Sequence, residues 1–342
     1  MTNTLDVNNC QLRIPSSQKP WAVILAGGDG VRLRPLSRLI SGDDRPKQFC
    51  PVFGDRSLLA HTRKRLAGVT EEDKTMFVVT RAHESFYADE LGGVCSGQVV
   101  VQPQNKGTGT AIVFALLRIA QRDPDAIVAF FPSDHFYSDE SRFLAAVESA
   151  VETAVVCPDS LVLLGAEATH PETGYGWIEP GPAPAWNVAG HLHQVVRFWE
   201  KPSLSTAQVL QRQGCLWNTF VMAGRAGAFL RLLESTVPGL LRGFSRFESS
   251  GDVAAAYLDE VAPVDFSRQV LSRCSSELLV VRMAASVGWS DLGEPERVLA
   301  TLAQAGMPLS MQPGLRSRQM QLRALYSSGT TPTDADSIAA VA

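Results

Sequence analysis

A glycine cluster followed by arginines is the stretch of this 342-residue sequence whose residue types best suit the binding of an anion. Gly27, Gly28 and Gly30 carry no side chain where backbone N–H groups would approach an anion and where a positive φ would be needed. Arg32 and Arg34 supply positive charge beside those amides. These residues therefore predict a phosphate-binding loop.

Two common glycine motifs do not match this loop. A dinucleotide fingerprint would require a glycine where the sequence has Leu33, and a Walker loop would require Gly-Lys-Ser/Thr shortly after the first glycine. A glycine turn at the end of a core strand would contain the same residues. Arg32 or Lys47, taken alone, would also suit a surface salt bridge. The choice depends on the motifs that follow.

Further short motifs follow the glycine loop along the chain. They are RPKQF (45–49), QPQNKGT (102–108), PSDH (132–135), GYG (174–176), EKP (200–202), WN (217–218), VDFS (264–267) and WSDLG (289–293). With them the sequence resembles the sugar-phosphate nucleotidyltransferases, most closely the mannose-1-phosphate guanylyltransferases, in which a GGxGxRLxPLS loop precedes PKQF. The resemblance covers about Trp21 to Leu299. It implies an α/β, Rossmann-like nucleotidyltransferase fold (glycosyltransferase-A-like) with a mostly parallel central sheet flanked by helices.

The reaction that this resemblance implies is attack by a hexose 1-phosphate oxygen on the α-phosphorus of a nucleoside triphosphate, with pyrophosphate leaving. The implied enzyme would make GDP-mannose from GTP and mannose 1-phosphate. A phosphate monoester has its second pKa at about 6, so the attacking oxygen is largely anionic at neutral pH and needs no general base. Positioning and charge neutralisation would therefore dominate catalysis.

The resemblance also implies three groups of site residues. The residues implied in catalysis are Arg32, Lys47, Asp134 and Asp291, of which the two aspartates would hold Mg²⁺ or Mn²⁺. The residues implied in nucleotide binding are Leu25, Ala26, Gly27, Gly28, Gly30, Arg32, Lys47, Gln102, Asn105 and Thr108. The residues implied in sugar-phosphate binding are Gly174, Glu200, Lys201 and Asn218. The segment 102–108 would read guanine.

Several interpretations stay open at this stage. Asp134 and Asp291 would also suit helix caps, and His135 suits a hydrogen-bonding role better than metal ligation. Phe220 and Val221 stand where many relatives have a glycine-containing WNSGMF-like segment, so the sugar is open. A nucleotidyltransferase for another sugar 1-phosphate or base is one alternative function. A non-catalytic regulatory subunit that binds a nucleotide sugar is another.

Composition limits the partners that we expect. The formal net charge is -4, from 31 basic and 35 acidic residues, which gives no general attraction for nucleic acid or an anionic membrane. No apolar run reaches the roughly 18 residues of a membrane span, and the N-terminal segment lacks the pattern of a secretory signal. The six cysteines lie far apart and predict neither zinc nor a disulfide framework. We expect a cytoplasmic protein, with a homo-oligomer left open.

Alternating strands and helices are expected to position the motifs. The expected strands are 22–26, 75–80, 99–102, 127–131, 161–164, 174–179, 195–200, 216–222 and 277–283. The expected helices are 57–66 with Ser57 as N-cap, 82–91, 108–121, 141–155, 203–213, 226–235 and 294–302. This alternation predicts a sheet covered on both sides, with ligands beyond the carboxyl ends of its strands.

The ends of the chain differ in composition from its centre. We expect residues 1–20 to form a mobile arm and residues 21–303 to form the nucleotidyltransferase catalytic domain. Residues 304–342 are expected to form a polar, partly disordered tail with a short helix near 315–326. Some relatives carry a C-terminal β-helix or a cupin-type isomerase domain, and we expect this tail to be too short for either.

Overall fold

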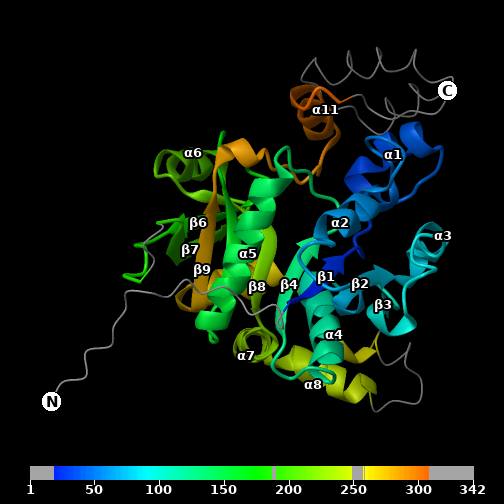
Figure 1. Ribbon diagram of the computed structural model, residues 1–342, viewed down its shortest axis with the longest axis horizontal. Coiled ribbons are helices and arrows are strands. Elements are labelled where there is room, and N and C mark those ends of the chain that lie inside the picture. The colour runs from blue at the N-terminus through cyan, green and yellow to red at the C-terminus, as the bar shows by residue number, and fades with distance from the viewer. Residues whose placement is uncertain (1–18, 187–189, 249–256, 258, 308–342) are drawn as a thin grey trace.

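In the computed structural model, which describes residues 19–186, 190–248, 257 and 259–307, nine strands form one sheet (Figure 1). Their order across the sheet is β3-β2-β1-β4-β8-β5-β9-β7-β6. The strands are β1 Trp21–Leu25, β2 Thr75–Thr80, β3 Val99–Gln102, β4 Ile127–Pro132, β5 Leu161–Glu167, β6 Gly176–Pro180, β7 Leu192–Glu200, β8 Leu216–Arg225 and β9 Leu278–Met283.

Helices lie along the sheet and at its edges. They are α1 Arg34–Ser41, α2 Leu58–Leu66, α3 Glu84–Tyr87, α4 Thr108–Ala120, α5 Glu140–Val156, α6 Leu204–Arg212, α7 Ala226–Thr236, α8 Pro238–Glu248, α10 Phe266–Gln269 and α11 Pro295–Gln304. Within the described ranges, no helix is both long and apolar enough to cross a membrane.

Strand direction divides the sheet into two parts. The pairs β1–β2, β2–β3 and β1–β4 are parallel, as the alternation of strand and helix predicted. In the other part, β8 is antiparallel to β4, β5 and β6, and β7 is antiparallel to β6 and β9, whereas β5–β9 is parallel. The α/β architecture is therefore confirmed. The parallel arrangement holds for the half that contains β1 to β4. The second half is mixed, and β5, β6 and β7 follow one another there with no helix between them in the described residues.

The first strand is buried on both faces, as its apolar run predicted. Val23 belongs to a core that includes residues of α4 and α7, while Ile24 belongs to a core that includes residues of α2 and α5. Successive side chains of a strand point to opposite faces, so these two cores lie on the two sides of the sheet. A rigid, doubly covered strand therefore delivers the glycine loop.

A third, smaller core connects the two ends of the described chain. Leu36 of α1 and Val298 of α11 belong to it, together with Leu33 and Leu292. Burial of these four side chains brings the loop that precedes α11 against the loop that precedes α1 (Figure 1). The glycine motif and WSDLG therefore face each other, although they are far apart in sequence.

Local signals predicted some elements better than others. The bounds of β2 and β3 are those predicted, and Ser57 caps α2 by accepting a hydrogen bond from the backbone N of Ala60 at 2.9 Å. The prediction of a helix over 82–91 was wrong in extent, because α3 spans four residues after a 3₁₀ turn. Helices α1, α8 and α10 were not predicted. The predicted arm and the predicted helix near 315–326 lie outside the described residues, apart from positions 19–20.

Candidate active site

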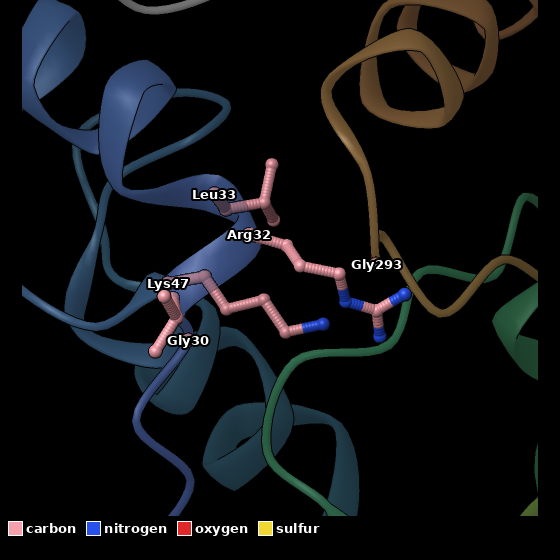
Figure 2. Close-up of a pocket in the computed structure, with 6 residues that line it drawn as sticks. Gly30, Arg32, Leu33, Lys47 and Gly293 are labelled. Atoms are coloured by element: carbon pink, nitrogen blue, oxygen red, sulfur yellow. The ribbon is translucent and has the colours of Figure 1, made fainter. Parts of the chain in front are cut away.

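A pocket of ≈ 240 Å³ opens between the glycine loop and the WSDLG loop (Figure 2). It is lined by Gly30, Val31, Arg32, Leu33, Lys47 and Gly293. Gly30 has a φ of 58°, and a Cβ there would lie 3.0 Å from the backbone N of Lys47. Only glycine suits both this conformation and this close approach. The RPKQF segment can therefore lie directly beneath the glycine loop.

Lys47 joins two of the predicted site residues. Its Nζ donates to the backbone carbonyls of Asp291 at 2.8 Å and Leu292 at 3.3 Å, and lies 3.1 Å from Oδ2 of Asp134. The side chains of Lys47 and Asp134 are only 16% and 18% exposed. One ammonium group therefore holds the carboxyl end of β4 against the WSDLG loop. The structure thus brings Lys47, Asp134 and Asp291 together, while their predicted roles toward a metal ion and a triphosphate stay predictions.

The carboxylate of Asp291 is strongly oriented by its neighbours. Its Oδ1 accepts hydrogen bonds from Arg297 Nη1 at 2.5 Å, from the hydroxyl of Tyr175 at 3.1 Å and from the backbone N of Gly293 at 2.8 Å. Burial acts to raise the pKa of Asp291, but the charges of Lys47 and Arg297 outweigh it and hold that pKa below its usual value. Asp291 is therefore ionised at neutral pH. Sequence reasoning missed Arg297, which no motif marks.

His135 has the hydrogen-bonding role that the sequence indicated. Trp289 Nε1 donates to His135 Nδ1 at 3.1 Å, so the ring proton of a neutral imidazole is on Nε2. Burial lowers the pKa of His135 to about 4, which keeps the ring neutral at physiological pH. Its Nε2 lies 4.0 Å from Oδ1 of Asp134. The histidine thus links PSDH to WSDLG.

Arg32 lies at the mouth of the pocket rather than at its floor. Its side chain is 61% exposed and extends toward the loop that carries Gly293, where Nη1 lies 3.1 Å from Oε1 of Glu294 (Figure 2). An exposed pair of this kind contributes only about 0–1 kcal/mol. Arg32 can therefore exchange Glu294 for another anion at little cost.

The segment predicted to read the base lies beside the glycine loop. Gln102 is buried, and its Nε2 lies 2.7 Å from the place that a Cβ at Gly27 would occupy. The hydroxyl of Tyr257 bonds Oε1 of Gln102 at 3.2 Å and the carbonyl of Gln104 at 3.2 Å. The absence of a side chain at Gly27 therefore allows the end of β3 to approach the end of β1.

Two of the predicted nucleotide-binding side chains are engaged within the protein. Asn105 donates to Oδ2 of Asp29 at 3.0 Å and accepts from the backbone N of Gly107 at 3.0 Å. The hydroxyl of Thr108 accepts from the backbone N of Phe266 at 3.0 Å. These contacts shape the loop. A direct contact of either side chain with a nucleotide stays a prediction.

The glycine loop itself is held by a residue that the sequence analysis did not single out. Gln48 Nε2 donates to the carbonyls of Ala26 at 3.0 Å and Gly28 at 2.7 Å. The backbone N of Ser133 bonds the carbonyl of Leu25 at 3.2 Å. Because the carbonyls are held from below, the loop amides have a fixed orientation. The only sequence signal for this role of Gln48 was its place within the PKQF motif.

The predicted sugar-binding residues meet around Gly176. A Cβ at this glycine would lie 3.1 Å from Oε2 of Glu200 and 3.4 Å from Cβ of Asn218. Lys201 has a φ of 47° and places Nζ 3.7 Å from Oε1 of Glu200. Burial raises the pKa of Glu200. The structure therefore brings Glu200, Lys201 and Asn218 together, while Gly174 lies next to Arg297.

The departure at Phe220 has a structural consequence. This residue has a φ of 59°, a conformation that favours glycine, and its ring forms an edge contact with Phe266 at 6.3 Å between centroids. Its backbone N donates to Oδ1 of Asn218 at 3.1 Å. An aromatic side chain therefore stands beside the predicted sugar pocket at a backbone position that would otherwise suit glycine.

The two aspartates fit a divalent cation by their chemistry and placement. The Lys47 ammonium contacts the carboxylate of Asp134 and the backbone carbonyl of Asp291, and Mg²⁺ prefers one or two carboxylates together with phosphate oxygens. Three hydrogen bonds occupy Oδ1 of Asp291 and none of them uses Oδ2. In the part of the chain that the structure describes, no group of three or more His, Cys, Asp or Glu could hold a metal ion.

A glycine loop at the end of a doubly covered strand, with Arg32 and Lys47 lining the pocket beside it, is typical of a nucleotide-binding α/β protein. The chain belongs to the nucleotidyl transferase family, whose model matches residues 21–305. The mannose-1-phosphate guanylyltransferase of Escherichia coli (strain K12) is 32% identical over 289 residues, covering 81% of this chain and 59% of the relative.

Two further similarities support this membership. The xanthan biosynthesis protein XanB of Xanthomonas campestris pv. campestris is 33% identical over 293 residues, covering 83% of this chain and 60% of that protein. A crystal structure described as mannose-1-phosphate geranyltransferase from Thermus thermophilus has a TM-score of 0.71 and 27% identity, covering 83% of this chain and 80% of that one. The chain spans about 60% of the length of the curated relatives that it matches.

Proposed function

We propose that this chain transfers a guanylyl group from GTP to mannose 1-phosphate, forming GDP-mannose and pyrophosphate. The observation that carries the proposal is that Lys47, which lines the pocket with Gly30 and Arg32 of the glycine loop, also contacts the carboxylate of Asp134 and the backbone carbonyl of Asp291. The names of relatives such as the Escherichia coli enzyme support the choice of substrates. The proposal concerns this chain, which is shorter than those relatives.

The catalytic task is to bring two polyanions together in line. The sugar phosphate is already largely anionic at neutral pH, since its second pKa is about 6. Lys47 lies at the floor of the pocket and Arg32 at its mouth, so the two cations would neutralise phosphate oxygens from two sides. The amides of the glycine loop, held by Gln48, would add oriented donors.

A divalent cation, Mg²⁺ or Mn²⁺, would be held by Asp134 and Asp291 and would reduce the negative charge on the reacting phosphates. Lys47 keeps the loops that carry these aspartates together. On the acceptor side, Glu200 and Asn218 would bind sugar hydroxyls and Lys201 the sugar phosphate. The cation, the cytoplasmic location and a homo-oligomer stay predictions.

A direct assay tests the proposal. The purified full-length chain is incubated with GTP, mannose 1-phosphate and Mg²⁺, and the products are identified by mass. We expect GDP-mannose and pyrophosphate in equal amounts, and we expect Asp134→Asn to abolish most of the turnover. ATP, UTP and dTTP, and a panel of other sugar 1-phosphates, are compared by kcat/KM.

The outcome also separates the alternative functions. When the wrong base leaves a buried polar group of the pocket without a hydrogen bond, binding is weaker by about 1–3 kcal/mol. This difference corresponds to roughly tenfold to hundredfold preference for GTP. Comparable kcat/KM for another nucleotide or sugar would favour a different nucleotidyltransferase. Tight binding of GDP-mannose without turnover of any pair would favour a regulatory subunit.

A further inference from the structure

We propose that Arg297 is a positioning residue, which holds one carboxylate oxygen of Asp291 so that the other oxygen is presented to the divalent cation. The proposal deepens the proposed function and rests on it for the role of the cation. It assigns Arg297 no contact with the reacting phosphates. Its basis is a set of contacts at the start of α11.

The guanidinium of Arg297 bonds two carboxylates at once. Nη1 lies 2.5 Å from Oδ1 of Asp291, and Nη2 lies 2.9 Å from Oε2 of Glu172. All three side chains are largely buried, with exposed fractions of 15% for Arg297, 21% for Asp291 and 17% for Glu172. The planar guanidinium group has N–H donors in fixed directions and can bond two carboxylates at once, which the single ammonium group of a lysine could not reproduce.

The neighbours of Arg297 fix the same oxygen. The guanidinium lies over the ring of Tyr175, 4.5 Å from its centroid, and the hydroxyl of Tyr175 donates to Oδ1 of Asp291. The backbone N of Gly293 is the third donor. A Cβ at Gly293 would lie 2.6 Å from Oδ2 of Asp291 and 2.9 Å from Nη1 of Arg297. The absence of a side chain there allows Arg297 to approach Asp291 this closely.

These contacts also join the aspartate to the acceptor side of the site. Oε1 of Glu172 accepts from the backbone N of Gly174 at 2.7 Å, within the segment predicted to contact the sugar. Glu172 and Arg297 together therefore connect the backbone at Gly174 with the carboxylate of Asp291. Movement at one of them would disturb the other.

Two effects of Arg297 on metal affinity oppose each other. Its positive charge repels a cation, but without it the buried carboxylates of Asp291 and Glu172 repel each other and Asp291 loses its orientation. Partners that orient metal ligands are typically worth about 10–100-fold in metal affinity. We therefore expect the loss of orientation to outweigh the loss of repulsion, so that removing Arg297 weakens metal binding. Tighter metal binding would mean the reverse.

The test is titration of the full-length protein with Mn²⁺ alone, with free Mn²⁺ measured by electron paramagnetic resonance. Arg297→Gln should weaken Mn²⁺ binding about tenfold or more. Arg297→Lys keeps the charge but loses the planar guanidinium group, so it should also weaken binding, by about threefold to tenfold. The matched control is Arg231→Gln on α7, which removes an exposed ion pair with Asp159 and should bind Mn²⁺ like the wild type.

Each other outcome overturns the proposal. Unchanged or tighter Mn²⁺ binding by Arg297→Gln would leave only a repulsive effect, and wild-type affinity in Arg297→Lys would show that charge alone matters. A wild type that binds no Mn²⁺ would remove the ligand role of Asp291. If Arg297→Gln does not fold, Tyr175→Phe provides the test, because it removes one hydrogen-bond donor to Oδ1 of Asp291 and keeps the aromatic ring. Tyr175→Phe should weaken Mn²⁺ binding about threefold. Unchanged Mn²⁺ affinity of this variant would refute the proposal. Failure of the wild type to form GDP-mannose would refute the proposed function alone.

Discussion

Replacement of Lys47 by Met should damage stability and activity together, because one ammonium group serves both. The variant loses the ion pair to Asp134 and the hydrogen bonds to the carbonyls of Asp291 and Leu292. Removing one partner of a buried ion pair typically costs about 3–5 kcal/mol. Since both side chains keep some exposure, we expect about 3 kcal/mol, or a fall in Tm of roughly 5 °C for a domain of this size.

The catalytic loss should be larger than this destabilisation explains. Loss of one oriented group that stabilises developing charge typically lowers kcat by about 10²–10³-fold. We therefore expect kcat for GDP-mannose formation to fall by about that factor at a temperature where the variant is folded. Lys64→Met, which changes an exposed lysine on α2, serves as the matched control and should leave Tm and kcat unchanged.

A double-mutant cycle with Asp134→Asn gives the result that would refute this reasoning. If Lys47 stabilises the fold by neutralising Asp134, then removing both charges should cost less than the sum of the single changes, by about 1–3 kcal/mol. Activity should not return in the double variant. Additive losses of stability, measured by urea unfolding, would show that the contact between Lys47 and Asp134 contributes nothing.

Three further predictions concern the rim, the glycine loop and the acceptor pocket. Glu294→Gln should free Arg32, so the KM for GTP should fall about twofold to fivefold at low salt while Tm hardly changes, and a higher KM would contradict the pairing. In Gly27→Ala the added methyl group should clash with the side chain of Gln102 and destabilise the fold by about 1–3 kcal/mol. GTP binding, measured by calorimetry, should be weaker, whereas wild-type affinity would mean that the loop adapts freely. Burial raises the pKa of Glu200, so the folded state binds the proton of this carboxyl group more tightly than the unfolded state. The free energy of unfolding therefore falls as the pH rises from the pKa of the unfolded state through the higher pKa of the folded state. Glu200→Gln should therefore raise Tm at pH 7 more than at pH 4 and raise the KM for mannose 1-phosphate, and an equal change in Tm at both pH values would contradict the assigned cause.

The sequence by itself determined the elements that depend on short-range signals. The apolar run before Gly27 predicted a buried strand, and the bounds of β2 and β3 followed from β-branched runs that end at polar residues. Asp134 was placed at a strand end for the same reason. These predictions succeeded because side-chain periodicity and backbone preference act over only a few residues.

Only the tertiary structure decided which of these segments touch. Lys47 donates a hydrogen bond to the carbonyl of Asp291, which is 244 positions away in the sequence, and Arg297 donates to Glu172, which is 125 positions away. An arginine in the first turns of an amphipathic helix gives no local sign of buried partners, so Arg297 was missed. Its environment arises because burial of Leu36, Val298 and their neighbours brings α1 and α11 together, and such long-range burial depends on the whole sheet rather than on any one stretch.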